Sequence, residues 1–228
     1  MKVPSCIVIL LLLACLPLVS CSTGAPSPTA VPITLQYTAA SYPWLVSIYD
    51  CAGNTVILAE QTAADIQDLQ AADIAIRLGQ LENLPSPAYQ IGTDDLLVIV
   101  NPQNPIKLLT VAQVRSLFNG QIQNWKDVGG IDAPVQVWAF TKTEDIQGIF
   151  NHLILSDSPV TSMARLASNP NEITQAISKD INAIGILNRR LITSGVSDVF
   201  TVTSMPVLAF TRSNPTEGIS NILSCLQK

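Results

Sequence analysis

The segment 109–130, LTVAQVRSLFNGQIQNWKDVGG, constrains the fold more than any other part of the chain. Thr110 is a suitable helix N-cap, because its hydroxyl can accept an unpaired backbone N–H of the first turn. Apolar residues then recur at helical spacing until Gly120, a residue that tolerates the positive φ of a helix end. The loop that follows is polar but contains Trp125. The pattern predicts a helix over 111–118, followed by a loop that packs against the protein.

This segment and its flanks resemble the matching region of phosphate-type solute-binding proteins of ABC importers. The resemblance depends on the order and spacing of Asn104, Pro105, Leu109, Thr110, Phe118, Gly120, Asn124, Trp125, Gly129 and Gly130. It implies an α/β protein with a two-lobed type II periplasmic-binding-protein-like fold. Each lobe would be a small, mostly parallel sheet flanked by helices, and crossing strands would join the lobes.

The resemblance covers the chain from about residue 33 to its end and predicts how the lobes divide it. Lobe 1 is expected to comprise residues 33–101 and 192–228, and lobe 2 residues 102–191. The segments NAIGILNRR and MPVLAFTRSNPTEGISNILSCLQK resemble the family's late strand and its closing strand, turn and helix.

The N-terminus has the features of an export signal. A basic start is followed by an apolar run that is too short for a membrane span, which predicts a signal peptide over 1–20. Leu-Val-Ser before Cys21 resembles a bacterial lipobox, in which that cysteine is lipidated. Residues 21–32 are rich in Ser, Thr and Pro and read as a solvated tether. The alternatives are an ordinary signal peptide or an uncut anchor.

Two cysteines remain in the mature chain, Cys51 and Cys225. An extracytoplasmic location permits a disulfide between them, which would join the C-terminal helix to the first lobe. Two separate buried thiols are the alternative, because two cysteines carry no spacing signature.

Alternating strand and helix patterns predict parallel packing of the strands. Strands are expected at 33–37, 54–59, 73–78, 92–101, 135–140, 183–187 and 199–202, with a closing strand after them. Helices are expected at 44–49, 63–70, 111–118, 144–155, 170–178 and the C-terminus. The strand 92–101 is apolar without alternation, which indicates burial on both faces.

Ligand sites in such folds lie where strand ends lead into helix N-termini, whose unpaired N–H groups suit oxyanions. Three places have that form: 38–41, 61–62 and 141–145. The candidate ligand-binding residues are Thr38, Ser41, Thr62, Arg77, Thr141 and Thr143. Arg77 is included because its planar guanidinium suits oxyanions, although a structural ion pair with Glu82 is the alternative.

The third of these places departs from the family pattern. Phosphate binders of the family have an arginine and then Ser-Gly-Thr there, but this chain has Glu144-Asp145-Ile146. The anion clamp is therefore not preserved, and two carboxylates lie where a phosphate would arrive. Carboxylates at a helix N-terminus also stabilise the helix without any ligand.

Composition argues against several function classes. The net charge is −5 and no long basic run is present, so nucleic acid is not an expected partner. The chain has one histidine, His152, which is interpreted as a partly exposed polar residue on a helix rather than part of a catalytic triad or metal site. Asp94 and Asp95 are adjacent on a strand and point to opposite faces, so they cannot act as paired acid and base.

The expectation is therefore a lipid-anchored extracytoplasmic solute-binding protein, monomeric and without catalysis, cofactor or metal. The resemblance implies phosphate or another oxyanion as its solute and an ABC permease as its partner. The alternative is a sensor or interaction module on the same scaffold, with the anion site lost.

Overall fold

The described strands of the chain pair into a single eight-stranded sheet in a computed structural model. The structure describes residues 32–53, 58–62, 72–79, 87–141 and 144–228. The strands are β1 Ile33–Tyr37, β2 Leu58–Thr62, β3 Ile74–Leu78, β4 Ala88–Val100, β5 Gln136–Phe140, β6 Arg165–Ala167, β7 Ala183–Asn188 and β8 Ser197–Thr211. The helices are α1 Leu45–Ala52, α2 Val111–Phe118, α3 Asp145–Leu155, α4 Pro170–Lys179 and α5 Glu217–Leu226.

The two ends of the sheet are parallel and its centre is antiparallel. The strand order is β2-β1-β3-β8-β4-β7-β5-β6. β1 pairs in parallel with β2 and β3, and β5 pairs in parallel with β6 and β7. Between these groups, β4 and β8 pair antiparallel with each other and with their outer neighbours. The predicted fold class is confirmed, and the two small parallel groups belong to one continuous sheet.

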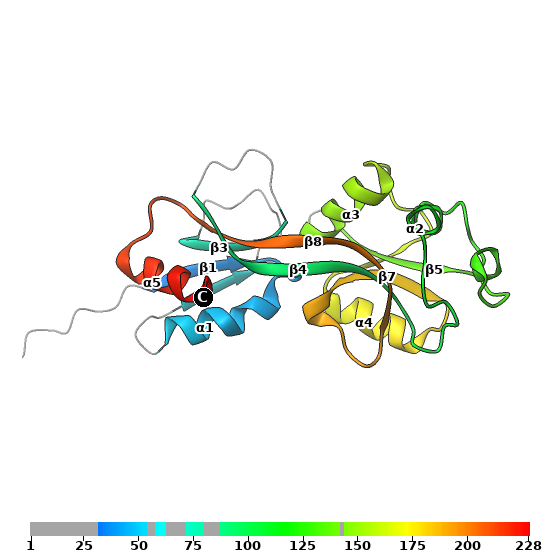
Figure 1. The fold of residues 1–228 in the computed structure, drawn as a ribbon, viewed down its shortest axis with the longest axis horizontal. Helices are drawn as coiled ribbons and strands as arrows, with labels where there is room; N and C mark the ends of the chain where they lie inside the picture. The colour runs from blue at the N-terminus through cyan, green and yellow to red at the C-terminus, as the bar shows by residue number, and fades with distance from the viewer. Residues whose placement is uncertain (1–31, 54–57, 63–71, 80–86, 142–143) are drawn as a thin grey trace, which may run out of the picture. The chain divides into compact units, whose positions relative to one another are not determined.

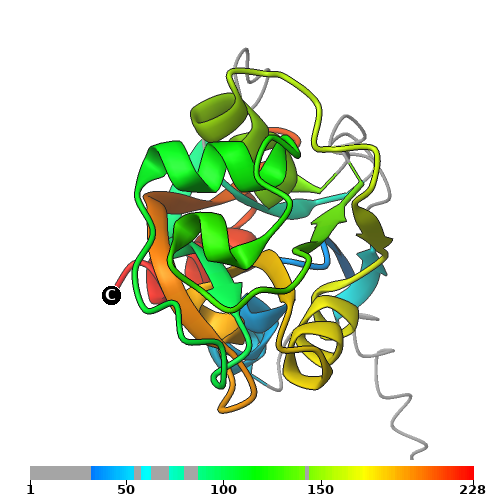
Figure 2. The same cartoon turned by 90° about the vertical axis from the view of Figure 1, so that its right-hand side faces the viewer.

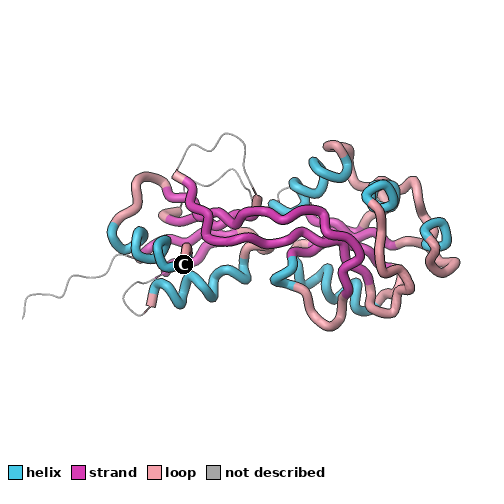
Figure 3. The backbone as a smooth tube through the Cα atoms, in the orientation of Figure 1, coloured by secondary structure: helices cyan, strands magenta, loops and turns pink. Residues whose placement is uncertain are grey.

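The helices cover both faces of this sheet. α2 and α3 lie on one side, whereas α1 and α4 lie on the other (Figures 1 and 2). Figure 3 shows β4 and β8 passing side by side from the neighbourhood of α1 and α5 to that of α4. The residues of β4 from Leu96 to Val100 are fully buried, as their unbroken apolar run predicted. Residues 31–228 form one compact unit, and its division into lobes at the expected boundaries stays a prediction.

Helix α2 begins and ends where the sequence predicted. The Thr110 hydroxyl accepts the Gln113 N–H, and the Gln113 side chain accepts the Thr110 N–H at 2.8 Å, which completes a capping box. Gly120, after the helix end, has a φ of +82°. In the following loop, Trp125 is fully buried and its Nε1 donates to the Asn182 carbonyl at 2.9 Å. The loop is therefore packed, as predicted.

A disulfide joins α1 to α5. Cys51 and Cys225 are bonded, with their Cα atoms 5.7 Å apart and 174 residues apart in sequence. This settles the alternative left open between a bridge and two free thiols.

Other element boundaries differ from the expectations. The strand expected at 54–59 is β2 at Leu58–Thr62, and the return strand and closing strand are one strand, β8. Residues 54–57, 63–71, 80–86 and 142–143 lie outside the described part, and so does the expected helix 63–70. The expected signal peptide, Cys21 and all but the last residue of the tether also lie outside it. Among the described residues, no helix is long and apolar enough to cross a membrane.

Candidate functional site

The turn after β1 presents a group of hydrogen-bond donors. Thr38 and Ser41 are buried, and the Thr38 N–H donates to Ser41 Oγ at 2.9 Å. Ser41 N–H in turn donates to the Thr38 carbonyl at 3.1 Å, which closes the turn. The turn thus places the hydroxyl of Thr38 and the N–H groups of Ala39 and Ala40 at the carboxyl end of β1.

The N-terminus of α3 supplies acceptors to these donors. Thr38 Oγ1 donates to Asp145 Oδ2 at 3.0 Å, and the Leu78 N–H at the end of β3 donates to the same oxygen at 3.0 Å. The backbone N–H groups of Ala39 and Ala40 favour the ionised form of the Glu144 carboxylate and hold its pKa down. The carboxyl ends of β1 and β3 thus supply two hydrogen bonds to Asp145 and two backbone N–H groups that act on Glu144.

Glu144 is the N-cap residue of α3, but its side chain does not cap that helix. An acidic N-cap side chain usually accepts an N–H of its own first turn. Here the carboxylate instead contacts Ala39 and Ala40, far away in the sequence. The side chain therefore joins two distant segments rather than stabilising its own helix end.

Burial makes the negative charge of this pair costly. Desolvation, opposed by the Leu78 N–H, Arg77 and Thr38, raises the pKa of Asp145 to about 6. Desolvation and then the charge of Asp145 raise the pKa of Glu144 to about 7, against the Ala39 and Ala40 N–H groups and Arg77. The environment therefore favours the uptake of a proton or another positive charge.

Arg77 is the nearby cation, and it is fully buried. Its Nη1 donates to the Ile76 carbonyl and its Nη2 to Gln36 Oε1, both at 2.9 Å. Burial lowers the pKa of Arg77, while the charges of Asp145 and Glu144 raise it. Within the described part of the chain, Arg77 Nε, Asp145 Oδ1 and Glu144 Oε2 are buried without a hydrogen-bond partner. The alternative ion pair with Glu82 involves a residue outside that part.

A small pocket lies beside this group of residues. It has a volume of about 220 Å³, and it is lined by Tyr37, Ala39, Tyr42, Asn169, Pro170, Asn171 and Leu191. Ala39 connects the two features, because its N–H acts on Glu144. We call this hollow the tyrosine pocket.

The predicted site residues have different outcomes. The structure brings Thr38, Ser41 and Arg77 near one another, because Ser41 contacts Thr38 and shares the Ile76 carbonyl with Arg77. Their role in ligand binding stays a prediction. Thr62 ends β2, where its backbone is in register with Tyr37, but nothing is described of its side chain. Thr141 is exposed and lines a different hollow, of about 580 Å³, between α3 and residues 157–164. Thr143 lies outside the described residues.

The sequence placed Glu144 and Asp145 at the site, but it did not predict that their carboxylates would contact the ends of β1 and β3. The donors it missed are the N–H groups of Ala39, Ala40 and Leu78. Backbone donors carry no side-chain signature, so only the positions of the strand ends could have indicated them.

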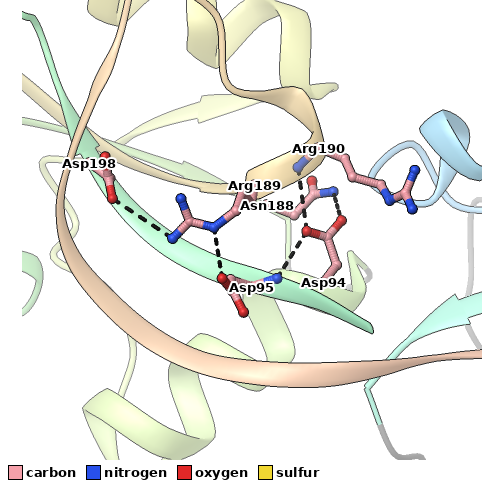
Figure 4. Close-up of polar contacts among 6 residues, drawn as sticks. All are labelled: Asp94, Asp95, Asn188, Arg189, Arg190 and Asp198. Carbon is pink, nitrogen blue, oxygen red and sulfur yellow. Dashed lines mark hydrogen bonds and ion pairs between the residues drawn. The ribbon is translucent and has the colours of Figure 1, made fainter. Parts of the chain in front are cut away.

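A second polar cluster lies where β4, β7 and β8 meet (Figure 4). Asn188 Nδ2 donates to Asp94 Oδ2 at 2.8 Å, and Arg189 Nε donates to Asp95 Oδ2 at 2.7 Å. The hydrogen bond from Arg189 lowers the pKa of Asp95. Asp94 and Asp95 therefore have separate partners. Each carboxylate already has a partner within the chain, so we interpret this cluster as a structural contact that links β4 to the end of β7.

Other candidates for chemistry are not built into a site. The side chain of His152 is 68% exposed at the end of α3, and its Nδ1 lies 3.3 Å from Asp157 Oδ2. Among the described residues, no three His, Cys, Asp or Glu side chains are grouped so that they could hold a metal ion.

A family model described as a PBP superfamily domain matches residues 58–218. The chain belongs to the PBP superfamily. Solved structures agree in fold. One is described as a phosphate ABC transporter substrate-binding protein from Clostridium perfringens with bound phosphate. It is 19% identical to this chain and has a TM-score of 0.78. The match covers 86% of this chain and 93% of that chain.

Two further solved structures with a similar fold are described as a transport receptor and as a regulatory domain. An ABC-type phosphate transport receptor from Vibrio cholerae is 20% identical, with 86% of this chain and 93% of that chain covered and a TM-score of 0.67. The OxyR2 regulatory domain from Vibrio vulnificus is 8% identical, with 87% and 97% covered and a TM-score of 0.64. At these identities the likeness establishes the fold alone.

Proposed function

We propose that this chain is an extracytoplasmic solute-binding protein, tethered by a lipid on Cys21, that captures a small solute and passes it to an ABC permease. The observation that carries the proposal is the contact of α3 with the ends of β1 and β3. Binding proteins use donors at strand ends and helix N-termini to hold a solute. The tyrosine pocket beside this contact gives such a solute a place to enter.

The mechanism that follows is a clamp. α3 belongs to the part of the sheet around β5 and β7, whereas Thr38 and Leu78 belong to the part around β1 and β3. β4 and β8 connect these parts. A solute that contacts both parts at once stabilises the closed arrangement. The proposed role needs binding and release, and no catalytic step.

The class of solute is the point where this chain and its sequence resemblance diverge. The resemblance implies an oxyanion, and one solved relative carries phosphate. In this chain, however, Glu144 and Asp145 already use the donors that an oxyanion would need. The geometry favours a solute that brings hydrogen-bond donors or a positive charge to these carboxylates.

A second candidate is an interaction or sensor module that binds a protein partner and no small solute. It is favoured by the same carboxylates, because they satisfy the donors between the two parts without any ligand. Regulatory domains share the fold, so the scaffold is compatible with such a role.

A thermal-shift screen followed by calorimetry separates the two candidates. The panel contains phosphate, sulfate, molybdate, tungstate, neutral solutes and small amines. We expect one saturable response in the low-micromolar range, which falls in a Tyr42→Ala variant of the pocket wall. Flat responses to every solute, from protein that unfolds cooperatively, would contradict solute capture and favour the interaction module.

A further inference from the structure

The contacts of Glu144 and Asp145 have the form of contacts to a bound anion. Thr38 Oγ1 and the N–H of Leu78 both donate to Asp145 Oδ2, each at 3.0 Å. The Ala39 and Ala40 N–H groups act on the Glu144 carboxylate and favour its ionised form. One hydroxyl and three backbone N–H groups, with Arg77 nearby, make up a donor set typical of oxyanion sites. Here two of those donors bond to Asp145, and the other two act on Glu144, so the chain's own carboxylates lie where the anion would bind.

We infer that Glu144 and Asp145 determine the specificity of this site: their carboxylates occupy the donors that an oxyanion requires and thereby exclude oxyanions. The inference rests on the proposed function, because it concerns the same site. It goes beyond the helix-stabilising interpretation of these residues, in which their charge near the N-terminus of α3 is enough and no partner at the ends of β1 or β3 is needed.

The negative charge of Glu144 and Asp145 also disfavours the binding of an oxyanion. Glu144 and Asp145 carry two negative charges when ionised, and Arg77 is the positive group that acts on both. Asp145 is only 3% exposed, so water screens its charge weakly. An incoming phosphate would add further negative charge at a place where burial already disfavours it. An oxyanion therefore meets both filled donors and like charge.

Removal of the two carboxylates should convert the site into an oxyanion site. The hydroxyl of Thr38 and the N–H groups of Ala39, Ala40 and Leu78 would then lack acceptors. The unpaired first N–H groups of α3 belong to the same helix end, because Asp145 is the first residue of α3. Arg77 would remain as the counter-charge.

The test compares the mature wild-type chain with Glu144→Ser/Asp145→Ala by calorimetric titration of inorganic phosphate at pH 8, where both carboxyls are ionised. Serine is chosen because it caps a helix well. We expect no phosphate binding to the wild type up to millimolar concentration. We expect the variant to bind phosphate at least about tenfold more tightly, because the donors freed from the two carboxylates can then bind the anion.

Two further variants keep the test decisive. Asp50→Asn/Asp127→Asn removes two exposed carboxylates elsewhere, and should leave phosphate binding as weak as in the wild type. Glu144→Ser alone keeps the buried Asp145 contacts, and should gain phosphate binding to a smaller extent even where the double variant fails to fold. A folded variant without any gain, or a control with the same gain, overturns the inference.

Failure of this inference can be told apart from failure of the proposed function. The inference predicts the response of altered chains to phosphate, whereas the proposed function predicts the response of the wild type to some solute. Wild-type binding of phosphate at micromolar concentration would overturn the inference and leave solute capture standing. If the variant gains phosphate binding and the wild type binds no solute, the inference stands and solute capture is contradicted.

Discussion

At the scale of single residues, the account depends on two adjacent acids, Asp145, which is buried, and Glu144, which is half-buried. Asp145 is 3% exposed, and its Oδ2 accepts two hydrogen bonds while Oδ1 lacks a partner among the described residues. Glu144 and Arg77 add one further charge of each sign. A group of this kind makes the stability of the protein depend on pH, because its protonation differs between the folded and unfolded chain.

We predict that the free energy of unfolding falls as the pH rises from about 4 to about 8. Burial raises the pKa of Glu144 to about 7 and that of Asp145 to about 6, above their ordinary values near 4. The folded chain therefore binds protons more tightly than the unfolded chain. The contribution is fully present below about pH 4 and is lost as the pH rises through 6 and 7.

Thermal unfolding measured by circular dichroism across this pH range checks the prediction. Glu144→Gln/Asp145→Asn keeps the size of both side chains and should show a flatter pH dependence than the wild type. Asp50→Asn, which alters an exposed carboxyl, should keep the wild-type dependence. Equal slopes in all three proteins would mean that the acids do not titrate in a buried environment.

At the scale of elements, the bounds of α2 followed from local signals, whereas the extent of β8 did not. α2 runs over the predicted residues because its capping box and its final Asn119-Gly120 pair act within a few positions. β8 is one strand of fifteen residues, whereas a return strand and a separate closing strand were expected. Its length is set by its pairing with β4 and β3, and pairing across that distance leaves no local pattern.

The candidate site shows the same division. Thr38, Ser41 and Arg77 were predicted from their places at strand ends, and the structure brings them together. The Ala39, Ala40 and Leu78 N–H groups were missed, because any residue except proline provides a backbone donor. That Glu144 and Asp145 would fill this donor set followed from the meeting of two distant segments, which the sequence alone does not reveal.

The link between α1 and α5 gives a prediction at this scale. The disulfide Cys51–Cys225 closes a long loop, with a sequence separation of 174. Loss of such a bridge increases the entropy of the unfolded chain and costs about 2–4 kcal/mol. Cys51→Ser/Cys225→Ser should therefore lower the melting temperature by about 5–15 °C.

Reductant provides the matched control for this variant. It should lower the melting temperature of the wild type to that of the double serine variant, and should leave the variant itself unchanged. A wild type whose melting temperature is insensitive to both reductant and substitution would show that the bridge adds nothing to stability.

At the scale of the whole described unit, β4 and β8 carry the connection between two parallel groups of strands. The fold class was predicted because the marker residues of the resemblance lie close together in sequence, around α2. The single continuous sheet was not predicted, because alternation of strands and helices indicates parallel packing and does not show the antiparallel centre. The contacts of Asp145 with the ends of β1 and β3 add a direct link between these groups outside the sheet.

A double-mutant cycle between Thr38 and Asp145 tests the central claim most directly, because it measures their contact in the solute-free chain. Thr38→Val, Asp145→Ala and the combined variant are unfolded by denaturant at one pH. The account predicts a coupling energy of about 1.5–3 kcal/mol, as for a buried hydrogen bond to a charged group. Effects that add to within about 0.5 kcal/mol would contradict it, because the carboxylate would then not bridge the two parts of the fold.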